Sequence, residues 1–406
     1  MKRMGLLTCI FFGEGVAVAC GNITKVVKVQ EHDEVWTSAT IGVVTACICV
    51  SYIVFMVYFD WVSKVQLPGW RQLTWTLLHF PLHLAMCLFM EGSSQFIVFW
   101  KVSEIRKAML NGFLTVMNEI DENHPEEFPD RVLDYIDEYI TKFPPVHSLT
   151  NNTLQEARQD LRNVDFASPN ATLEMVLTPV VNALVAMENT LWNRYGIDFT
   201  QDVVDSGSKN PEFDTIREQL FPSLDGLDDA QGSIAVKSAT RFRIVYQYTF
   251  ACAGIFLAFA NLISIVSRTK RWTWSASIYH AVIFVLALCI GLVAAVSQDA
   301  EAFENYSDSP WILPTLLLTF FLILILNHVS GWLAARRDAK TTQRHGQVEQ
   351  YSLEHSNSSG GVNKQQYTPV SLAVPDNEQM ARNFSVPRRP LPYEPYGSSY
   401  SSGYPA

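Results

Sequence analysis

Five long apolar stretches constrain this chain more than any other feature of its sequence. They cover 36–59, 75–99, 244–266, 274–296 and 311–332. Four contain no Asp, Glu, Lys or Arg, and the second contains only Glu91. A helix needs ~20 mainly apolar residues to cross the ~30 Å hydrocarbon core of a bilayer, where it satisfies its own backbone hydrogen bonds. The pattern therefore predicts an all-α, multi-pass membrane protein, in the plasma membrane or an endomembrane.

The tryptophans support this prediction. Indole rings favour the headgroup level of a bilayer, where the ring is sheltered and its N–H is hydrated. Nine of the ten tryptophans lie at or near the ends of the apolar stretches: Trp36, Trp61, Trp70, Trp75, Trp100, Trp272, Trp274, Trp311 and Trp332. We therefore expect the lipid bilayer to be the main partner of the chain.

A sixth, shorter apolar stretch covers 4–20 and follows Lys2 and Arg3. It predicts one more span, which brings the total to about six. The small residues at 17–20 also fit the cleavage site of a signal peptide, although Glu14 interrupts the apolar region. Both interpretations leave the later helices in the same orientation.

Charge divides the rest of the chain into segments. Residues 1–100 and 243–335 hold three predicted spans each. Between them, 101–242 carries 24 acidic against 12 basic residues, with apolar residues at helical spacing. This segment predicts an acidic helical domain outside the membrane, and its charge argues against nucleic acid as a partner. Residues 336–406 form a predicted cytoplasmic tail, and from 341 onward they have too few aliphatic residues to order.

Short loops rich in Lys and Arg face the cytoplasm. If six helices alternate, one face receives Lys2, Arg3, Lys64, Arg71, Arg268, Lys270, Arg271, Arg336, Arg337 and Lys340, so both termini are predicted to be cytoplasmic. Acceptor sequons for N-glycosylation fall on the opposite face at Asn22, Asn151, Asn170 and Asn305. Two sets of residues disagree with this orientation. They are the basic residues Lys101, Arg106, Lys107, Lys237, Arg241 and Arg243 beside the acidic segment, and the sequons at Asn357 and Asn383 in the tail.

Polar residues inside the spans are candidate functional groups, because charge in hydrocarbon is costly. Glu14 and Glu91 are predicted at similar depth, slightly beyond the midplane, where they would act together as a buried carboxylate pair. His79 and His83 lie four residues apart and so share one helix face. His280 and His328 are predicted in the same leaflet as that pair. Together these side chains predict a path for protons or small cations, and the alternative is that they only fix helix packing.

No catalytic motif accompanies these residues. The sequence has no phosphate-binding glycine loop, zincin motif or nucleophile elbow, so an enzyme is not predicted. The seven cysteines all lie in or beside apolar stretches, which is typical of packing residues. We predict no disulfide framework, metal site or cofactor.

The tail offers a second functional hypothesis. The sequence from Arg388 through Pro390 and Pro392 to Pro395 is typical of a polyproline ligand for an aromatic groove. A solvated low-complexity tail is the alternative. The two functions that remain are coupled proton or cation transport, and a membrane-anchored sensor or scaffold acting through the acidic domain and the tail.

Three segments of the first hundred residues resemble the fungal form of the low temperature requirement A family of membrane proteins. They are 3–8 leading to Gly13-Glu14, 78–84, which reads Leu-His-Phe-Pro-Leu-His-Leu, and 91–96, which reads Glu-Gly-Ser-Ser-Gln-Phe. The resemblance implies an integral membrane protein with no established reaction. The family usually begins with further helices and an acidic, aromatic motif that this chain does not match, so the resemblance implies a truncated or divergent member.

Overall fold

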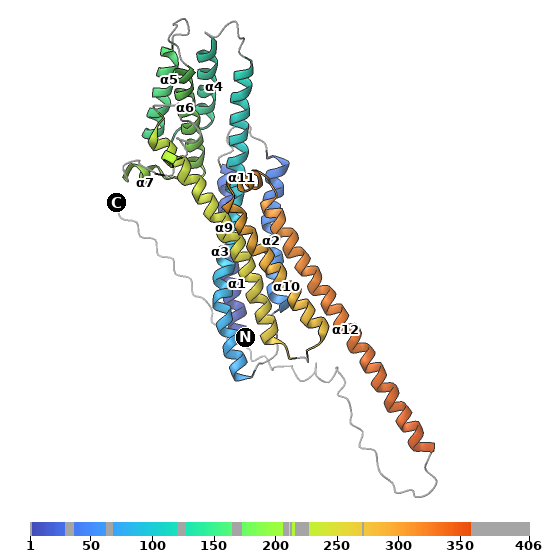
Figure 1. Ribbon diagram of the computed structural model, residues 1–406. Helices are drawn as coiled ribbons and strands as arrows, with labels where there is room; N and C mark the ends of the chain where they lie inside the picture. The colour runs from blue at the N-terminus through green and yellow to red at the C-terminus, as the bar shows by residue number, and fades with distance from the viewer. Residues whose placement is uncertain are drawn as a thin grey trace, which may run out of the picture. The chain divides into compact units, whose positions relative to one another are not determined.

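The computed structural model describes residues 2–28, 36–61, 68–119, 127–164, 173–205, 211, 213–215, 227–269 and 272–358. The chain forms two compact units, residues 1–337 and 338–406. All regular structure in the described residues is helical, so the predicted all-α class is confirmed. The elements are α1 Lys2–Lys28, α2 Ser38–Trp61, α3 Gly69–Asn118, α4 Phe128–Lys142, α5 Ser148–Asn163, α6 Leu173–Arg194, α7 Thr200–Asp205, α9 Asp229–Ser267, α10 Trp274–Leu292, the 3₁₀ helix η2 Val293–Gln298, α11 Ala300–Ser307 and α12 Ile312–Ser358 (Figure 1).

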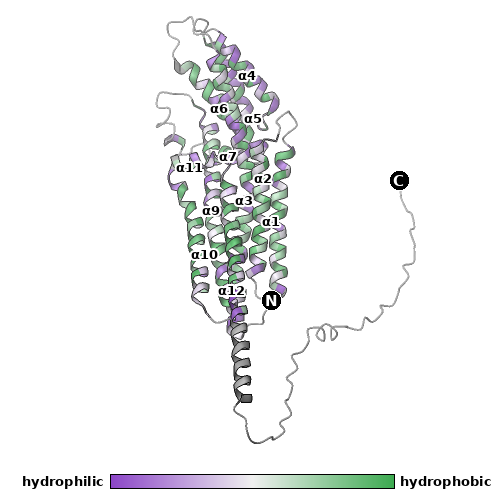
Figure 2. Cartoon of the chain, turned by 90° about the vertical axis from the view of Figure 1, so that its right-hand side faces the viewer, coloured by the Kyte–Doolittle hydropathy of each residue, from purple (hydrophilic) through white to green (hydrophobic). Residues whose placement is uncertain are grey.

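Six of these helices are long and apolar enough to span a membrane, which confirms a multi-pass membrane protein. They are α1, α2, α3, α9, α10 with η2, and α12 up to Arg337. The stretch 4–20 lies within α1, which packs along α3. The hydropathy of the chain changes along the long helices, from apolar in the bundle to polar beyond it (Figure 2).

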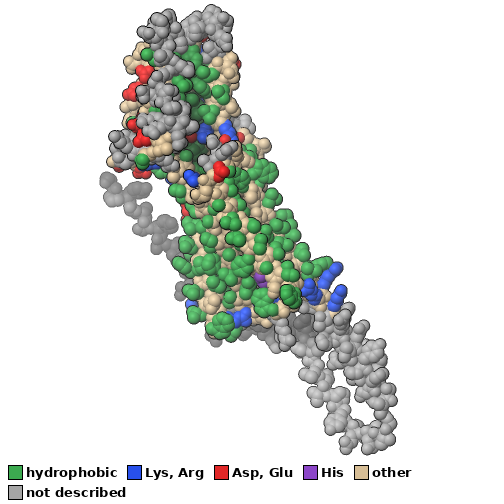
Figure 3. Space-filling view, in the orientation of Figure 1, with side chains coloured by type: hydrophobic (Ala, Val, Ile, Leu, Met, Phe, Trp, Pro, Cys, Tyr) green, Lys and Arg blue, Asp and Glu red, His purple; other side chains and the backbone are tan. Residues whose placement is uncertain are grey.

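Large apolar side chains face outward from the bundle. On α3 they include Leu73, Leu77 and Phe80, each more than 70% exposed. A water-facing surface rarely presents such a continuous apolar area, whereas hydrocarbon requires one. The apolar area covers the visible face of the bundle in Figure 3, with charged side chains near its ends.

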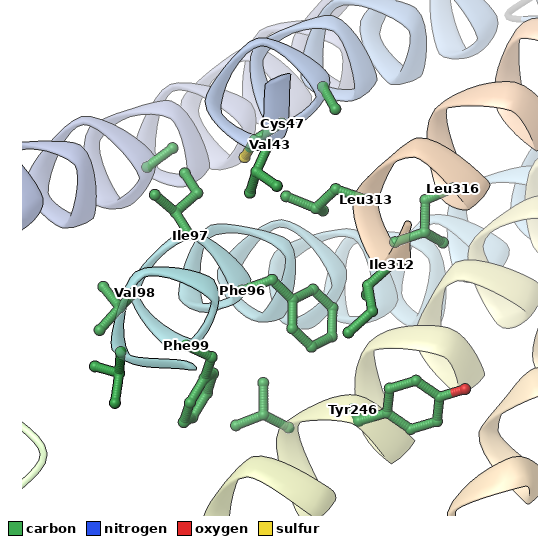
Figure 4. Close-up of a cluster of buried hydrophobic side chains, with 14 of the residues drawn as sticks. Val43, Cys47, Phe96, Ile97, Val98, Phe99, Tyr246, Ile312, Leu313 and Leu316 are labelled. Carbon is green, nitrogen blue, oxygen red and sulfur yellow. The ribbon is translucent and has the colours of Figure 1, made fainter. Parts of the chain in front are cut away.

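The core of the bundle is a cluster of apolar side chains around α3 (Figure 4). Val43 and Cys47 of α2 meet Phe96 of α3 and Leu313 of α12 there, and Tyr246 reaches the cluster from α9. Helix α3 also contacts α1 along its length and makes extensive contacts with α9. Because α9 packs in turn against α10, α3 and α9 together form the centre of the bundle.

Helices α3 and α9 continue beyond the membrane without interruption. The predicted domain boundaries at 100/101 and 242/243 fall inside these two helices, which contain 50 and 39 residues. The reason is that helical apolar spacing persists past the uncharged stretch, at Ile105 and Met109. The segments 101–118 of α3 and 229–242 of α9, together with α4, α5, α6 and α7, form what we call the extramembrane domain.

Hydrogen bonds attach the extramembrane domain to these two long helices. The Tyr135 hydroxyl of α4 donates to the Met109 carbonyl of α3 at 2.6 Å. On α9, Gln231 is fully buried, and its side-chain and backbone oxygens accept hydrogen bonds from the Asn189 amide of α6 at 2.8 and 2.9 Å. The Gln231 amide in turn donates to Thr150 and Thr153 of α5.

Helix α12 is longer than the sequence predicts. The tail was expected to be disordered from Thr341, but the helix continues to Ser358. The residues between these positions include three Gln and two Glu, which have high intrinsic helix propensity. The remaining tail, 359–406, with Asn383, lies outside the described residues.

Helices α9 and α10 approach each other through glycine. A Cβ atom at Gly254 would lie 2.6 Å from the Ala287 carbonyl oxygen and 2.9 Å from Gly291 Cα. Backbone atoms cannot rotate away as a side chain can. Small residues at such contacts allow the close packing that holds helices together in lipid.

We expect Gly254→Val to destabilise the bundle, because the added side chain must push α10 away. Overpacking of this kind costs about 1–3 kcal/mol. The measurement is the thermal midpoint of the purified full chain in detergent. Gly42→Val is the matched control, since a Cβ at Gly42 meets nothing within 4 Å; an equal shift in both variants would contradict the close-contact argument.

Candidate functional site

The two intramembrane carboxylates lie on the surface of the bundle. Glu14 of α1 and Glu91 of α3 are both exposed, and no interaction joins their side chains among the described residues. Their neighbours Gly15 and Met90 lie against each other, so the two carboxylates lie at a similar level along the bundle. The prediction that the two carboxylates are buried is therefore wrong. Position within an apolar stretch predicts depth but not the face of the helix.

His79 and His83 are buried where α1, α2 and α3 meet. The Thr8 hydroxyl lies 2.7 Å from both His83 Nε2 and the Tyr58 hydroxyl. His79 Nδ1 lies 2.7 Å from the Trp75 carbonyl oxygen, which can only accept, so Nδ1 carries the proton. In neutral His79, Nε2 is then an acceptor, and it has no hydrogen-bond partner among the described residues. We call Thr8, Tyr58, His79 and His83 the histidine cluster.

The other two histidines do not join this cluster. His280 Nδ1 donates to Asn261 Oδ1 at 2.7 Å, and the Asn261 amide donates back to the His280 carbonyl at 3.0 Å. This reciprocal pair is buried and ties α9 to α10. His328 is exposed, and its Nδ1 lies 2.9 Å from the Leu324 carbonyl of its own helix. The four histidines thus occupy three separate environments.

A polar junction at Asn327 was not predicted as a functional group. Asn327 Oδ1 accepts hydrogen bonds from Trp61 Nε1 at 3.1 Å and from the Tyr279 hydroxyl at 3.2 Å. Its amide donates to Asp60 Oδ2 at 3.0 Å. The junction connects α2, α10 and α12. The sequence held a signal for this junction. Asn327 is the one Asn of the apolar stretch 311–332, and Asp60 directly follows the apolar stretch 36–59.

Acidic partners account for basic residues that disagreed with the predicted orientation. Arg106 Nη2 and Lys107 Nζ lie 3.2 and 3.4 Å from the Asp308 carboxylate. Lys101, only 2% exposed, lies 3.1 Å from the Glu104 carboxylate. Paired cations of this kind serve packing. They are therefore weaker evidence that their segment faces the cytoplasm than cations without an acidic partner would be.

The predicted glycosylation sites differ in accessibility. Asn22 is 7% exposed, and its side-chain amide donates to Ser94 Oγ at 3.0 Å. That nitrogen would have to carry the sugar, so the prediction at Asn22 is corrected. Asn151 and Asn305 are exposed at the end of the bundle that bears the extramembrane domain. Asn170 lies outside the described residues, and of Asn357 only the helical backbone is described.

The described residues contain no group of three His, Cys, Asp or Glu side chains that could hold a metal ion. The seven cysteines are free thiols.

No family model, curated protein or solved structure matches this chain. Fold and composition therefore define the class, a multi-pass α-helical membrane protein.

We expect N-linked sugar on Asn151 and Asn305 and none on Asn22. The check is electrophoretic mobility of the native protein before and after glycosidase treatment. Asn151→Gln and Asn305→Gln should each remove part of the shift, whereas Asn22→Gln should leave it unchanged. Sugar on Asn357 or Asn383 would invert the predicted topology.

Proposed function

We propose that this protein is a membrane-anchored sensor or scaffold in which the extramembrane domain controls the packing of the spans. The observation that carries the proposal is the continuity of α3 and α9. Each runs from the extramembrane domain through the bundle as one helix. A rigid helix transmits displacement along its axis, so an event in the domain reaches the opposite end of the bundle.

Polar contacts at the domain side strengthen this coupling. Arg106 of α3 lies 3.2 Å from Asp308, just before α12, and 3.9 Å from Glu188 of α6. Asn189, next to Glu188, is bonded to Gln231 of α9. The ion pairs of Arg106 thus join α3 to α6 and to the segment before α12, and a separate hydrogen-bonded pair joins α6 to α9.

The opposite end of the bundle contains junctions that would register such a displacement. The Asn261–His280 pair joins α9 to α10, and Asn327 joins α2, α10 and α12. The proposal adds the tail, with Arg388, Pro390 and Pro392 binding an aromatic-grooved protein in the cytoplasm. Those residues lie outside the described part of the chain.

We expect Asn189→Ala to loosen both the extramembrane domain and the bundle. Loss of its bonds to Gln231 leaves buried acceptors unpaired, at a cost of about 1–3 kcal/mol. The measurement is amide hydrogen exchange of the full chain in lipid nanodiscs. Exchange should rise in α5 and α6, and also in 244–267 of α9 and in α10.

Arg131→Ala is the matched control within the same domain. Among the described residues, Arg131 makes ion pairs to Glu127 at 3.5 Å and to Glu119 at 3.9 Å, which are exposed and contribute little. Its exchange pattern should equal that of the wild type. A change in Asn189→Ala confined to 101–242 would show that the domain is not coupled to the spans.

Coupled proton or cation transport is a second candidate, and the histidine cluster is the observation that favours it. Two imidazoles and two hydroxyls lie close together between three helices, with ring centroids of His79 and His83 5.6 Å apart. Buried imidazole and hydroxyl groups can pass a proton along hydrogen bonds. The exposed positions of Glu14 and Glu91 make an enclosed path through the carboxylates a weaker expectation.

If the protein transports protons, His83→Gln should abolish proton flux into reconstituted vesicles, while His147→Gln in the extramembrane domain should not. Glu14→Gln, Glu91→Gln and their double variant test the carboxylates in the same assay. Truncation after Lys340 should leave transport intact but remove scaffolding. Silence of the wild-type protein would eliminate the transport candidate.

Membership of the low temperature requirement A family is also a proposal. It is supported by the Leu-His-Phe-Pro-Leu-His-Leu sequence at 78–84, which supplies both histidines of the cluster, and by 91–96. An alignment of homologues that retains His79, His83 and Glu91 together would support it.

A further inference from the structure

A cavity lies where the bundle meets the extramembrane domain. It has a volume of about 190 Å³, well above the ~10–15 Å³ that a single water needs. Four parts of the chain form its wall: α1, α3, the turn after α6, and α9. The polar side chains that line it include Asn22, Lys25, Glu91, Gln95 and Arg241.

Two cations and one carboxylate face this cavity without neutralising one another. No ion pair joins Lys25 or Arg241 to any acidic group in the part of the chain that is described. Arg241 lies 5.8 Å from the Phe199 ring, a cation–π contact that leaves its donors available. The Glu91 carboxylate accepts one hydrogen bond, from Gln95 Nε2 at 2.9 Å. The cavity therefore offers cationic donors and a separate anionic acceptor.

The turn that closes the cavity is firmly held. Gly196 has a φ of 80° and ends α6, with hydrogen bonds from its N–H to Asn193 O and from Ile197 N–H to Trp192 O, both 3.0 Å. This is the Schellman pattern, which favours glycine at the left-handed position. A Cβ at Gly196 would lie 3.9 Å from Lys25 Nζ, so the turn reaches the α1 ammonium closely.

Asp198 anchors the same turn. Its carboxylate accepts hydrogen bonds from His147 Nε2 at 2.5 Å and from the Thr200 backbone N–H at 2.9 Å. Partial burial acts to raise the pKa of Asp198, but the hydrogen bonds from Thr200 and His147 outweigh burial and lower its pKa below the ordinary value. The anchor therefore stays charged at neutral pH. A preformed wall reduces the ordering cost of binding a ligand.

The part of the cavity at Arg241 and Phe99 corresponds to the headgroup level of a bilayer, and Glu91 lies deeper, inside the apolar stretch 75–99. Arg241 lies three residues before the apolar stretch 244–266, and Phe99 ends the stretch 75–99. Val18 and Val98 give the cavity an apolar side. Lys25 and Glu91 are exposed on the bundle surface, so a lipid can reach both side chains from outside the bundle.

We propose that this cavity binds the headgroup of a membrane phospholipid that carries a primary amine. The phosphate contacts Lys25 and Arg241, and the ammonium group contacts Glu91. A purely anionic headgroup would be repelled by Glu91. A trimethylated ammonium has no N–H to donate, whereas a primary ammonium has three. The inference does not depend on the proposed sensor function.

The test uses the full purified chain in detergent and native mass spectrometry with three lipids of identical acyl chains: phosphatidylethanolamine, phosphatidylcholine and phosphatidylglycerol. Wild-type protein should bind phosphatidylethanolamine most tightly. The variant Lys25→Gln/Arg241→Gln should bind it about tenfold more weakly, because charge-assisted hydrogen bonds to phosphate are lost. Glu91→Gln should keep phosphate binding and lose the preference for phosphatidylethanolamine over phosphatidylglycerol.

Lys28→Gln and Glu156→Gln are charge-matched controls, because neither residue lines the cavity, and both should bind as wild type does. The thermal midpoint of each variant shows that it is folded, and Glu91→Gln alone tests the site if the double variant is not. Equal binding of the three lipids by wild type, or unchanged binding in the cavity variants, would overturn the proposal. So would tight binding of soluble phosphoethanolamine with no preference among the lipids.

Discussion

The requirement that every backbone hydrogen bond be satisfied in hydrocarbon determines the architecture of this protein. It makes each apolar stretch a helix. Because lipid provides no hydrophobic drive between helices, close fits and interhelical hydrogen bonds must hold the bundle together. Gly254 provides such a fit, and Asn261, Thr8 and Asn327 provide such bonds. Of these contacts, those of Asn327 join α2 in the first half of the chain to α10 and α12 in the second.

Hydropathy was sufficient to predict the all-α class and the six spans, but not the faces of the helices. A stretch in which almost every residue is apolar has little amphipathic pattern to show which side is inside. Glu14 and Glu91 were therefore expected inside the bundle and lie on its surface. Asn22 was expected to be accessible for glycosylation and is buried against Ser94. Only the packing of α1 on α3 distinguishes these cases.

The ends of the long helices were also beyond the sequence-based predictions. Hydropathy falls at Lys101, so a boundary was placed there, yet 101–118 contains no proline, and α3 continues to Asn118. The partners of Arg106 and Lys107 were equally hidden, because Asp308 is about 200 residues away in sequence. Long-range pairs of this kind require the fold itself.

The uninterrupted length of α3 has a mechanical consequence. At ~1.5 Å of rise per residue, the part of α3 beyond residue 100 extends about 27 Å from the bundle. Spanning helices tilt to match the thickness of the surrounding hydrocarbon. A tilt of ~5° would swing the far end of this lever by about 2 Å, enough to reset contacts between packed side chains. Under the proposed sensor function, bilayer thickness, set by lipid composition, would be an input to the extramembrane domain that needs no soluble ligand.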